Sequence, residues 1–143
     1  MDIHTNWIAV IVAAVAHFII GFLWYSVFFM KPWMKEMGLD KLTPKQRKEG
    51  MKEMPKSMAI NFVTLVITAW VLSYVIAYAG AFYKMSGAMT GVQSAIWVWL
   101  GFFATTLVNT VIWEKKSWKL YAINVSHHLA GLLAMGIILG AWM

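Results

Sequence analysis

The chain has 143 residues, of which 61 % are hydrophobic and 13 % are charged, and its mean hydropathy is +0.66. A soluble domain carries about a quarter charged residues and cannot bury this much apolar surface, and a disordered chain needs low hydrophobicity. The sequence contains no cysteine, which excludes disulfide scaffolds, thiol catalysis and thiolate metal sites. The composition therefore predicts a small integral membrane protein.

Four apolar stretches are long enough to cross a bilayer as helices. A span needs about 20 mostly apolar residues, and the candidates cover residues 7–29, 58–80, 89–113 and 120–142. Transmembrane strands would show alternating apolar and polar residues, which these stretches lack. The short connectors after the second and third spans make neighbouring helices antiparallel. The sequence thus predicts an all-α fold, an integral membrane four-helix antiparallel bundle forming a single transmembrane domain over residues 1–143.

The connector at 30–57 is long and charged, and it contains a signal for the start of a helix. Thr43 fits the N-cap position, Pro44 the first helical position, and Gln46 the place where a capping box has Glu or Gln. We expect a short amphipathic helix that runs to about Met54, ends at Pro55 and lies on the headgroups at the membrane interface.

Lysine and arginine are distributed unequally between the two ends of the predicted bundle. The connectors at 30–57 and 114–119 hold eight and three of them, whereas the connector at 81–88 holds only Lys84 and the termini hold none. The positive-inside rule then places the connector 30–57 in the cytoplasm and both termini outside it. We expect the basic connector to contact anionic lipid headgroups of the bilayer, and we do not expect nucleic acid as a partner.

Polar side chains inside the spans gather in the half of the bilayer near the basic connectors. Such groups are costly in hydrocarbon and usually face the bundle interior. His127 and His128 are adjacent and so lie about 100° apart on a helix; we expect one to face the interior and the other a neighbouring helix or subunit. The candidate polar cavity comprises His17, Ser26, Asn61, Asn109, Asn124, His127 and His128.

Small residues recur at helical spacing around these imidazoles, where they let another backbone approach closely. The last span also contains a G-x-x-x-G motif, which marks a close helix contact either within the chain or between subunits. The residues predicted to pack helices together are Ala13, Gly21, Gly131, Gly136 and Gly140.

Three roles for the polar residues remain open. They could form interhelical hydrogen bonds, line a ligand or ion cavity open to the cytoplasm, or hold a metal or proton through His17 and one of the adjacent histidines. Two histidines without an intramembrane carboxylate make a poor metal site, so we predict no metal and no cofactor. The sequence contains no catalytic motif that we can assign, and we predict no catalytic residue.

Three segments resemble one known family. They are the opening Asn6-Trp7-x-Ala9, the run Gly21-x-x-Trp24-Tyr25-Ser26 followed by Lys31-Pro32-Trp33, and the ending from His128 to Trp142 with its Gly-x-Ile-x-Gly-x-Trp pattern. They look like the bacterial membrane family catalogued as domain of unknown function 1761. Members often have proline after the Trp-Tyr-Ser element, where this chain has Val27. The resemblance implies a small multi-span protein of the bacterial inner membrane and implies no activity.

The first functional hypothesis is a non-enzymatic, homo-oligomeric membrane protein that binds lipid or a partner. The second is a small transporter or channel with a polar cavity facing the cytoplasm. The third is a membrane enzyme acting on a lipophilic substrate, and no motif in the sequence singles out such an enzyme.

Overall fold

The computed structural model describes residues 3–143, and within this range the chain is helical and contains no strand. Four helical rods in it are long and apolar enough to cross a membrane, at Trp7–Phe28, Pro44–Tyr83, Ala88–Ile112 and Trp118–Trp142. The prediction of an all-α bundle of long apolar helices is confirmed. In chain order the elements are α1 (Trp7–Leu23), η1 (Trp24–Phe28), α2 (Met30–Glu36), η2 (Leu39–Lys41), α3 (Pro44–Tyr83), α4 (Ala88–Val98), η3 (Trp99–Ala104), α5 (Thr105–Leu107), α6 (Asn109–Ile112) and α7 (Trp118–Trp142).

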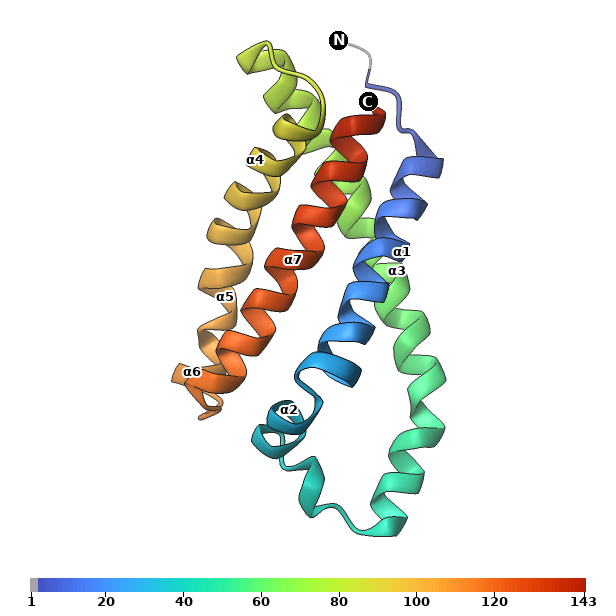
Figure 1. Ribbon diagram of the computed structural model, residues 1–143, viewed down its shortest axis with the longest axis vertical. Helices are drawn as coiled ribbons and strands as arrows, with labels where there is room; N and C mark the ends of the chain where they lie inside the picture. Colours follow the sequence, from blue (N-terminus) through green and yellow to red (C-terminus); the bar gives the residue numbers. More distant parts are fainter. Residues whose placement is uncertain (1–2) are drawn as a thin grey trace.

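The rods alternate in direction, so that each lies antiparallel to its neighbours in the chain (Figure 1). The C-terminus and the turn between α3 and α4 lie at one end of the bundle, as does the start of α1. The segment that holds α2 and η2 and the turn before α7 lie at the other end. The two lysine-rich connectors therefore share one end, and the connector with Lys84 lies at the opposite end.

Short polar side chains start three of the rods. Asn6 accepts a hydrogen bond from the backbone of Ala9, and Ser117 caps α7 in the same way. At the start of α3 the capping box is complete, because the Thr43 hydroxyl accepts from the Gln46 N–H at 3.2 Å while the Gln46 side chain accepts from the Thr43 N–H at 3.0 Å. The helix start predicted at Thr43 is confirmed.

The helix that starts at Thr43 differs from the expected one in its length. It does not end at Pro55 but continues as one 40-residue helix to Tyr83, so the predicted interfacial helix is the exposed first part of α3. Proline removes one backbone donor and crowds the preceding turn. Residues 43–61 are all exposed, so solvent or headgroups can hydrogen-bond the carbonyl that Pro55 leaves free.

Two of the rods contain π-helical segments, η1 and η3. Each begins with a tryptophan whose indole N–H donates to a backbone carbonyl of α7: Trp24 to Ile123 at 3.1 Å and Trp99 to Val125 at 2.8 Å. A π-helical turn shifts the side chains that follow it around the helix. The distortion in η1 contains Val27 and no proline.

The core lies where α7 packs against α1, α3 and α4. Small side chains fill much of it, which lets the helices approach closely without a large hydrophobic gain, as is usual between helices in lipid. The fully buried aliphatic residues include Ala9, Val10, Ala13 and Ala14 of α1, Ala69 of α3, Ala95 of α4 and Leu132 of α7. Ala13, predicted to pack helices, lies in this cluster.

Candidate functional site

Three imidazole rings meet between α1 and α7, near the middle of the bundle. The ring centroid of His17 lies 5.1 Å from that of His127 and 6.1 Å from that of His128, and the adjacent rings are 4.8 Å apart. His17 is 2 % exposed and His127 is 9 % exposed. Ionisable side chains are rare inside membrane-spanning bundles and often mark a functional site, so this cluster is the candidate site.

Both His127 and His128 lie near His17; His127 is buried, while His128 is partly buried and lies against the neighbouring rod. Adjacent residues are about 100° apart around the axis of α7, so the two rings approach His17 from different directions. His127 lies toward Tyr25 of η1, with ring centroids 5.0 Å apart. His128 lies toward Phe103 of η3, also with ring centroids 5.0 Å apart.

Two glycines make room for these rings. A Cβ on Gly131 of α7 would overlap the ring of His17, and a Cβ on Gly21 of α1 would lie 2.9 Å from Nε2 of His127. Each helix thus carries a His-x-x-x-Gly pair, and each imidazole packs on the glycine of the opposite helix. Gly21 and Gly131, which were predicted to pack helices, lie beside the histidines. Each must be small because the imidazole of the opposite helix occupies the space of its side chain.

A tyrosine and an asparagine extend the cluster toward the lysine-rich end. The Tyr25 hydroxyl donates to Oδ1 of Asn124 at 2.7 Å and lies 3.4 Å from Nδ1 of His127. Because η1 is π-helical, it carries Tyr25 toward α7. In the sequence, Tyr25 stands out only as part of the motif that carries the family resemblance, and this contact was not predicted.

A cavity of about 360 Å³ borders the histidines and lies between α1, η1, α3 and α7. All three imidazoles line it, and Ser26 of η1 and Asn61 of α3 supply further polar groups. Phe18, Phe22 and Met58 give it apolar walls. The cavity is therefore amphiphilic, with both polar and apolar side chains in its lining.

The structure brings together five of the seven predicted cavity residues, namely His17, Ser26, Asn61, His127 and His128. Asn124 stands one hydrogen bond away, through Tyr25. Asn109 does not line this cavity; it is exposed on α6. Its predicted depth matched that of the other residues, but it belongs to the rod at Ala88–Ile112, from which no residue lines this cavity.

Two ring nitrogens in the cluster are left without a partner. Nδ1 of His17 and Nδ1 of His128 are buried and have no hydrogen-bond partner among residues 3–143. A buried polar group without a partner costs about 1–3 kcal/mol. In the same part of the chain, no group of three or more His, Asp or Glu side chains is arranged to hold a metal ion.

The G-x-x-x-G motif of α7 makes its close contact within this chain. A Cβ on Gly136 would overlap the backbone carbonyl of Gly91, and a Cβ on Gly140 would lie 2.6 Å from the carbonyl oxygen of Gly87. Gly87 and Gly91 form a second G-x-x-x-G motif at the start of α4. Sequence reasoning missed this partner, although the same four-residue spacing could have revealed it.

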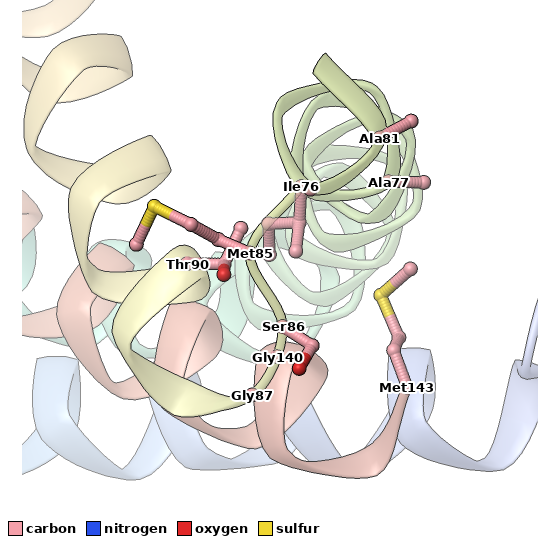
Figure 2. A pocket seen from close by; sticks show the side chains of 10 residues that line it. Ile76, Ala77, Ala81, Met85, Ser86, Gly87, Thr90, Gly140 and Met143 are labelled. Atoms are coloured by element: carbon pink, nitrogen blue, oxygen red, sulfur yellow. The ribbon is translucent and has the colours of Figure 1, made fainter. Parts of the chain in front are cut away.

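A second, smaller cavity of about 200 Å³ lies at the other end of the bundle. It is enclosed by the end of α3, the segment Met85–Gly87, the first turn of α4 and the end of α7 (Figure 2). Thr90 lines it beside Met85, and the Thr90 hydroxyl is buried without a hydrogen-bond partner in the described part of the chain. This end of the bundle also contains polar groups that the sequence reading did not single out.

A family model described as "Protein of unknown function (DUF1761)" matches residues 8–140. The chain belongs to this family. The match confirms the resemblance inferred from the three segments, and it covers all four long helices of this DUF1761 protein. Comparison with curated proteins and with solved structures finds no match.

Proposed function

We propose that this DUF1761 protein is a non-enzymatic membrane protein that binds an amphiphilic molecule in the cavity between α1, α3 and α7. The observation that carries the proposal is that the cavity is lined by His17, His127 and His128 together with Ser26 and Asn61, while the buried Nδ1 atoms of His17 and His128 have no hydrogen-bond partner among residues 3–143. A ligand with hydrogen-bonding groups would find polar side chains on several sides of the cavity.

Interhelical hydrogen bonding alone accounts for only part of the cluster. It involves Asn124 and His127, which both meet the Tyr25 hydroxyl. It leaves His17 and His128 out, although Gly131 makes space for the ring of His17. Helix packing by itself would be served better by aliphatic residues at both positions, because these leave no polar atom without a partner.

The mixed lining of the cavity favours a lipid-like ligand with an anionic headgroup. Ser26 and Met58 line the cavity and lie close in the chain to Lys31 and Lys56 of the basic connector. An anionic headgroup at this end would gain from the nearby positive charge, while Phe18 and its apolar neighbours would contact a hydrocarbon portion.

We also propose an orientation for the protein in a bacterial inner membrane. The lysine-rich connectors lie at one end of the bundle and the C-terminus at the other (Figure 1). The charge difference supports a cytoplasmic location for the connectors and a location outside the cytoplasm for both termini.

Association of several chains remains part of the proposal. The rod formed by α4, η3, α5 and α6 is the least covered of the four and exposes large aromatic side chains, with Trp97 72 %, Phe102 71 % and Trp113 77 % exposed. Such a face contacts either lipid or another chain. Light scattering in mild detergent tests whether several chains associate, and a strictly monomeric protein would contradict association.

The test of ligand binding is native mass spectrometry of the protein in mild detergent with added phosphatidylglycerol. We expect an adduct that weakens at least tenfold in Gly131→Ala, which displaces His17, and that persists in Gly101→Ala, whose Cβ would meet nothing within 4 Å. An adduct of equal affinity in both variants would refute the site.

A transporter is the second candidate, and one observation favours it. The polar lining runs from His17, in the middle of α1, to Ser26, near the lysine-rich end, as an entry path from the cytoplasm would. Flux of a solute into proteoliposomes, lost when His17, Asn61 and His128 are replaced, would favour transport over static binding. Flux that survives those replacements would reject this path.

A further inference from the structure

The hydroxyl of Tyr25 contacts two side chains of α7, and it has one proton for both contacts. It donates this proton to Oδ1 of Asn124 at 2.7 Å. The same oxygen lies 3.4 Å from Nδ1 of His127. Because the tyrosine proton is committed to Asn124, the second contact is a hydrogen bond when Nδ1 of His127 carries a proton and donates it to the tyrosine oxygen.

A proton on Nδ1 leaves Nε2 of His127 without one, because this imidazole is neutral. His127 is 9 % exposed, and no Asp or Glu of the described chain lines the cavity beside it. Neither Trp7–Phe28 nor Trp118–Trp142 contains a carboxylate that could offset a buried positive charge. In a neutral imidazole one nitrogen donates and the other accepts. Nε2 of His127 therefore offers a lone pair and no proton.

This acceptor lies at the wall of the histidine cavity. A Cβ added to Gly21 would lie 2.9 Å from Nε2 of His127, and both residues line the cavity. The ring nitrogens that are buried without a partner are the Nδ1 atoms of His17 and His128, and Nε2 of His127 is not one of them. Among residues 3–143 the hydrogen bonding of His127 side-chain nitrogens is confined to Nδ1, so the lone pair on Nε2 is open to a ligand.

The other polar residues of the cavity wall do not discriminate between donors and acceptors. Ser26 and Asn61 line the cavity, and a serine hydroxyl or an asparagine amide can both donate and accept. An imidazole held in one tautomer does discriminate. A site that hydrogen-bonds a hydroxyl group rejects an analogue without it, because the polar group of the site is then left unpaired.

We infer that the histidine cavity selects an amphiphile with a free hydroxyl group, which donates to Nε2 of His127, and that Tyr25 and Asn124 are positioning residues that keep this nitrogen an acceptor. This inference rests on the proposed function and adds the chemical group that the site recognises. An ammonium donor would be repelled by the lysine-rich connector at this end of the bundle (Figure 1). An anionic lipid with a hydroxylated headgroup, such as phosphatidylglycerol, satisfies both the charge and the acceptor.

The direct test compares phosphatidylglycerol with phosphatidylpropanol, which has the same charge and a propyl headgroup without hydroxyl groups. Binding of each lipid to the full-length protein in mild detergent is measured by native mass spectrometry. We expect phosphatidylglycerol to bind about tenfold more tightly to the wild type, and this preference to fall to about twofold or less in Tyr25→Phe. Tyr25→Phe should weaken binding of phosphatidylglycerol alone, whereas a purely structural role of Tyr25 would weaken both lipids equally.

Tyr121→Phe is the matched control. The Tyr121 hydroxyl also donates from one rod to another, to the carbonyl of Ala104 at 2.8 Å, and Tyr121 does not line the cavity. This variant should keep the lipid preference of the wild type.

Two binding results would overturn the inference, and they differ in what they mean for the proposed function. Equal affinity of the wild type for both lipids, with both weakened by Gly131→Ala, would reject hydroxyl selection and leave ligand binding in the cavity intact. Equal affinity that Gly131→Ala does not change would refute the proposed function as well.

The tautomer of His127 can be read in the wild-type protein without any ligand, which keeps the inference testable if Tyr25→Phe does not fold. In ¹⁵N-histidine-labelled protein, protonated and unprotonated ring nitrogens give well-separated resonances. We expect the proton of His127 on Nδ1, and a mixture of both tautomers in Tyr25→Phe. A proton on Nε2 in the wild type would overturn the inference even if phosphatidylglycerol binds in the cavity.

Discussion

The ring of His17 occupies the space that a side chain at position 131 would need, so that α1 and α7 can approach only because residue 131 is glycine. The reciprocal contact, between His127 and Gly21, is slightly looser. These two histidine–glycine contacts hold the imidazoles beside the cavity, and substitutions of the glycines can test them.

Gly131→Ala should destabilise the protein, because the new Cβ would overlap the ring of His17. Overpacking of this kind costs about 1–3 kcal/mol. Gly21→Ala should cost less, since it meets only the far end of the His127 ring at 2.9 Å. Gly101→Ala should be neutral or slightly stabilising. Thermal unfolding in one detergent would check this order, and a Gly101→Ala variant as unstable as Gly131→Ala would contradict it.

Gly91→Ala should be more damaging than any of these. Its Cβ would meet the backbone carbonyl of Gly136, which cannot move aside as a side chain can. We expect α4 to separate from α7, with faster hydrogen exchange in both helices around this contact. Gly87→Ala would be a poor control, because Gly87 has φ +84°. Gly50→Ala has open space and a negative φ, and its exchange should remain at the wild-type rate.

The hydrogen bond between Tyr25 and Asn124 can be measured by a double-mutant cycle with Tyr25→Phe and Asn124→Leu. Interhelical hydrogen bonds in membranes contribute about 0.6 kcal/mol on average and up to about 1.7. The 2.7 Å distance predicts a coupling energy toward the upper end of this range. The cycle requires unfolding free energies of the four proteins, and strictly additive changes would mean that the bond is absent in the bilayer.

The proposed orientation can be tested simply because the sequence contains no cysteine. His4→Cys and Ser57→Cys each introduce one thiol at an exposed position. A membrane-impermeant maleimide should label His4→Cys in intact cells and Ser57→Cys only after permeabilisation. Labelling of both thiols from the same side would reject the orientation.

The architecture was predictable because it rests on long apolar runs and on a capping box around Thr43, both of which are local in sequence. The continuation of α3 through Pro55 was not predictable from local rules, since the cost of proline depends on what surrounds the helix. Residues 43–61 of α3 are exposed, so solvent or headgroups can hydrogen-bond the carbonyl that Pro55 leaves free, and the helix continues.

The candidate site was predictable in its residues but not in its arrangement. Depth and helical face placed His17, His127 and His128 in one candidate cavity, which all three line. They could not exclude Asn109, because depth alone does not give the rotation of a rod about its axis. The π-helical segments η1 and η3 decide which side chains reach α7. No pattern in the sequence indicated them.

The central claim is that a bound molecule hydrogen-bonds to the histidine cluster, and ring nitrogen NMR tests it most directly. The sequence holds four histidines, and exposed His4 serves as an internal control. In ¹⁵N-histidine-labelled protein, addition of phosphatidylglycerol should shift the Nδ1 resonances of His17 and His128 and leave those of His4 in place. Unchanged spectra at saturating lipid, or a shift confined to His4, would contradict the claim.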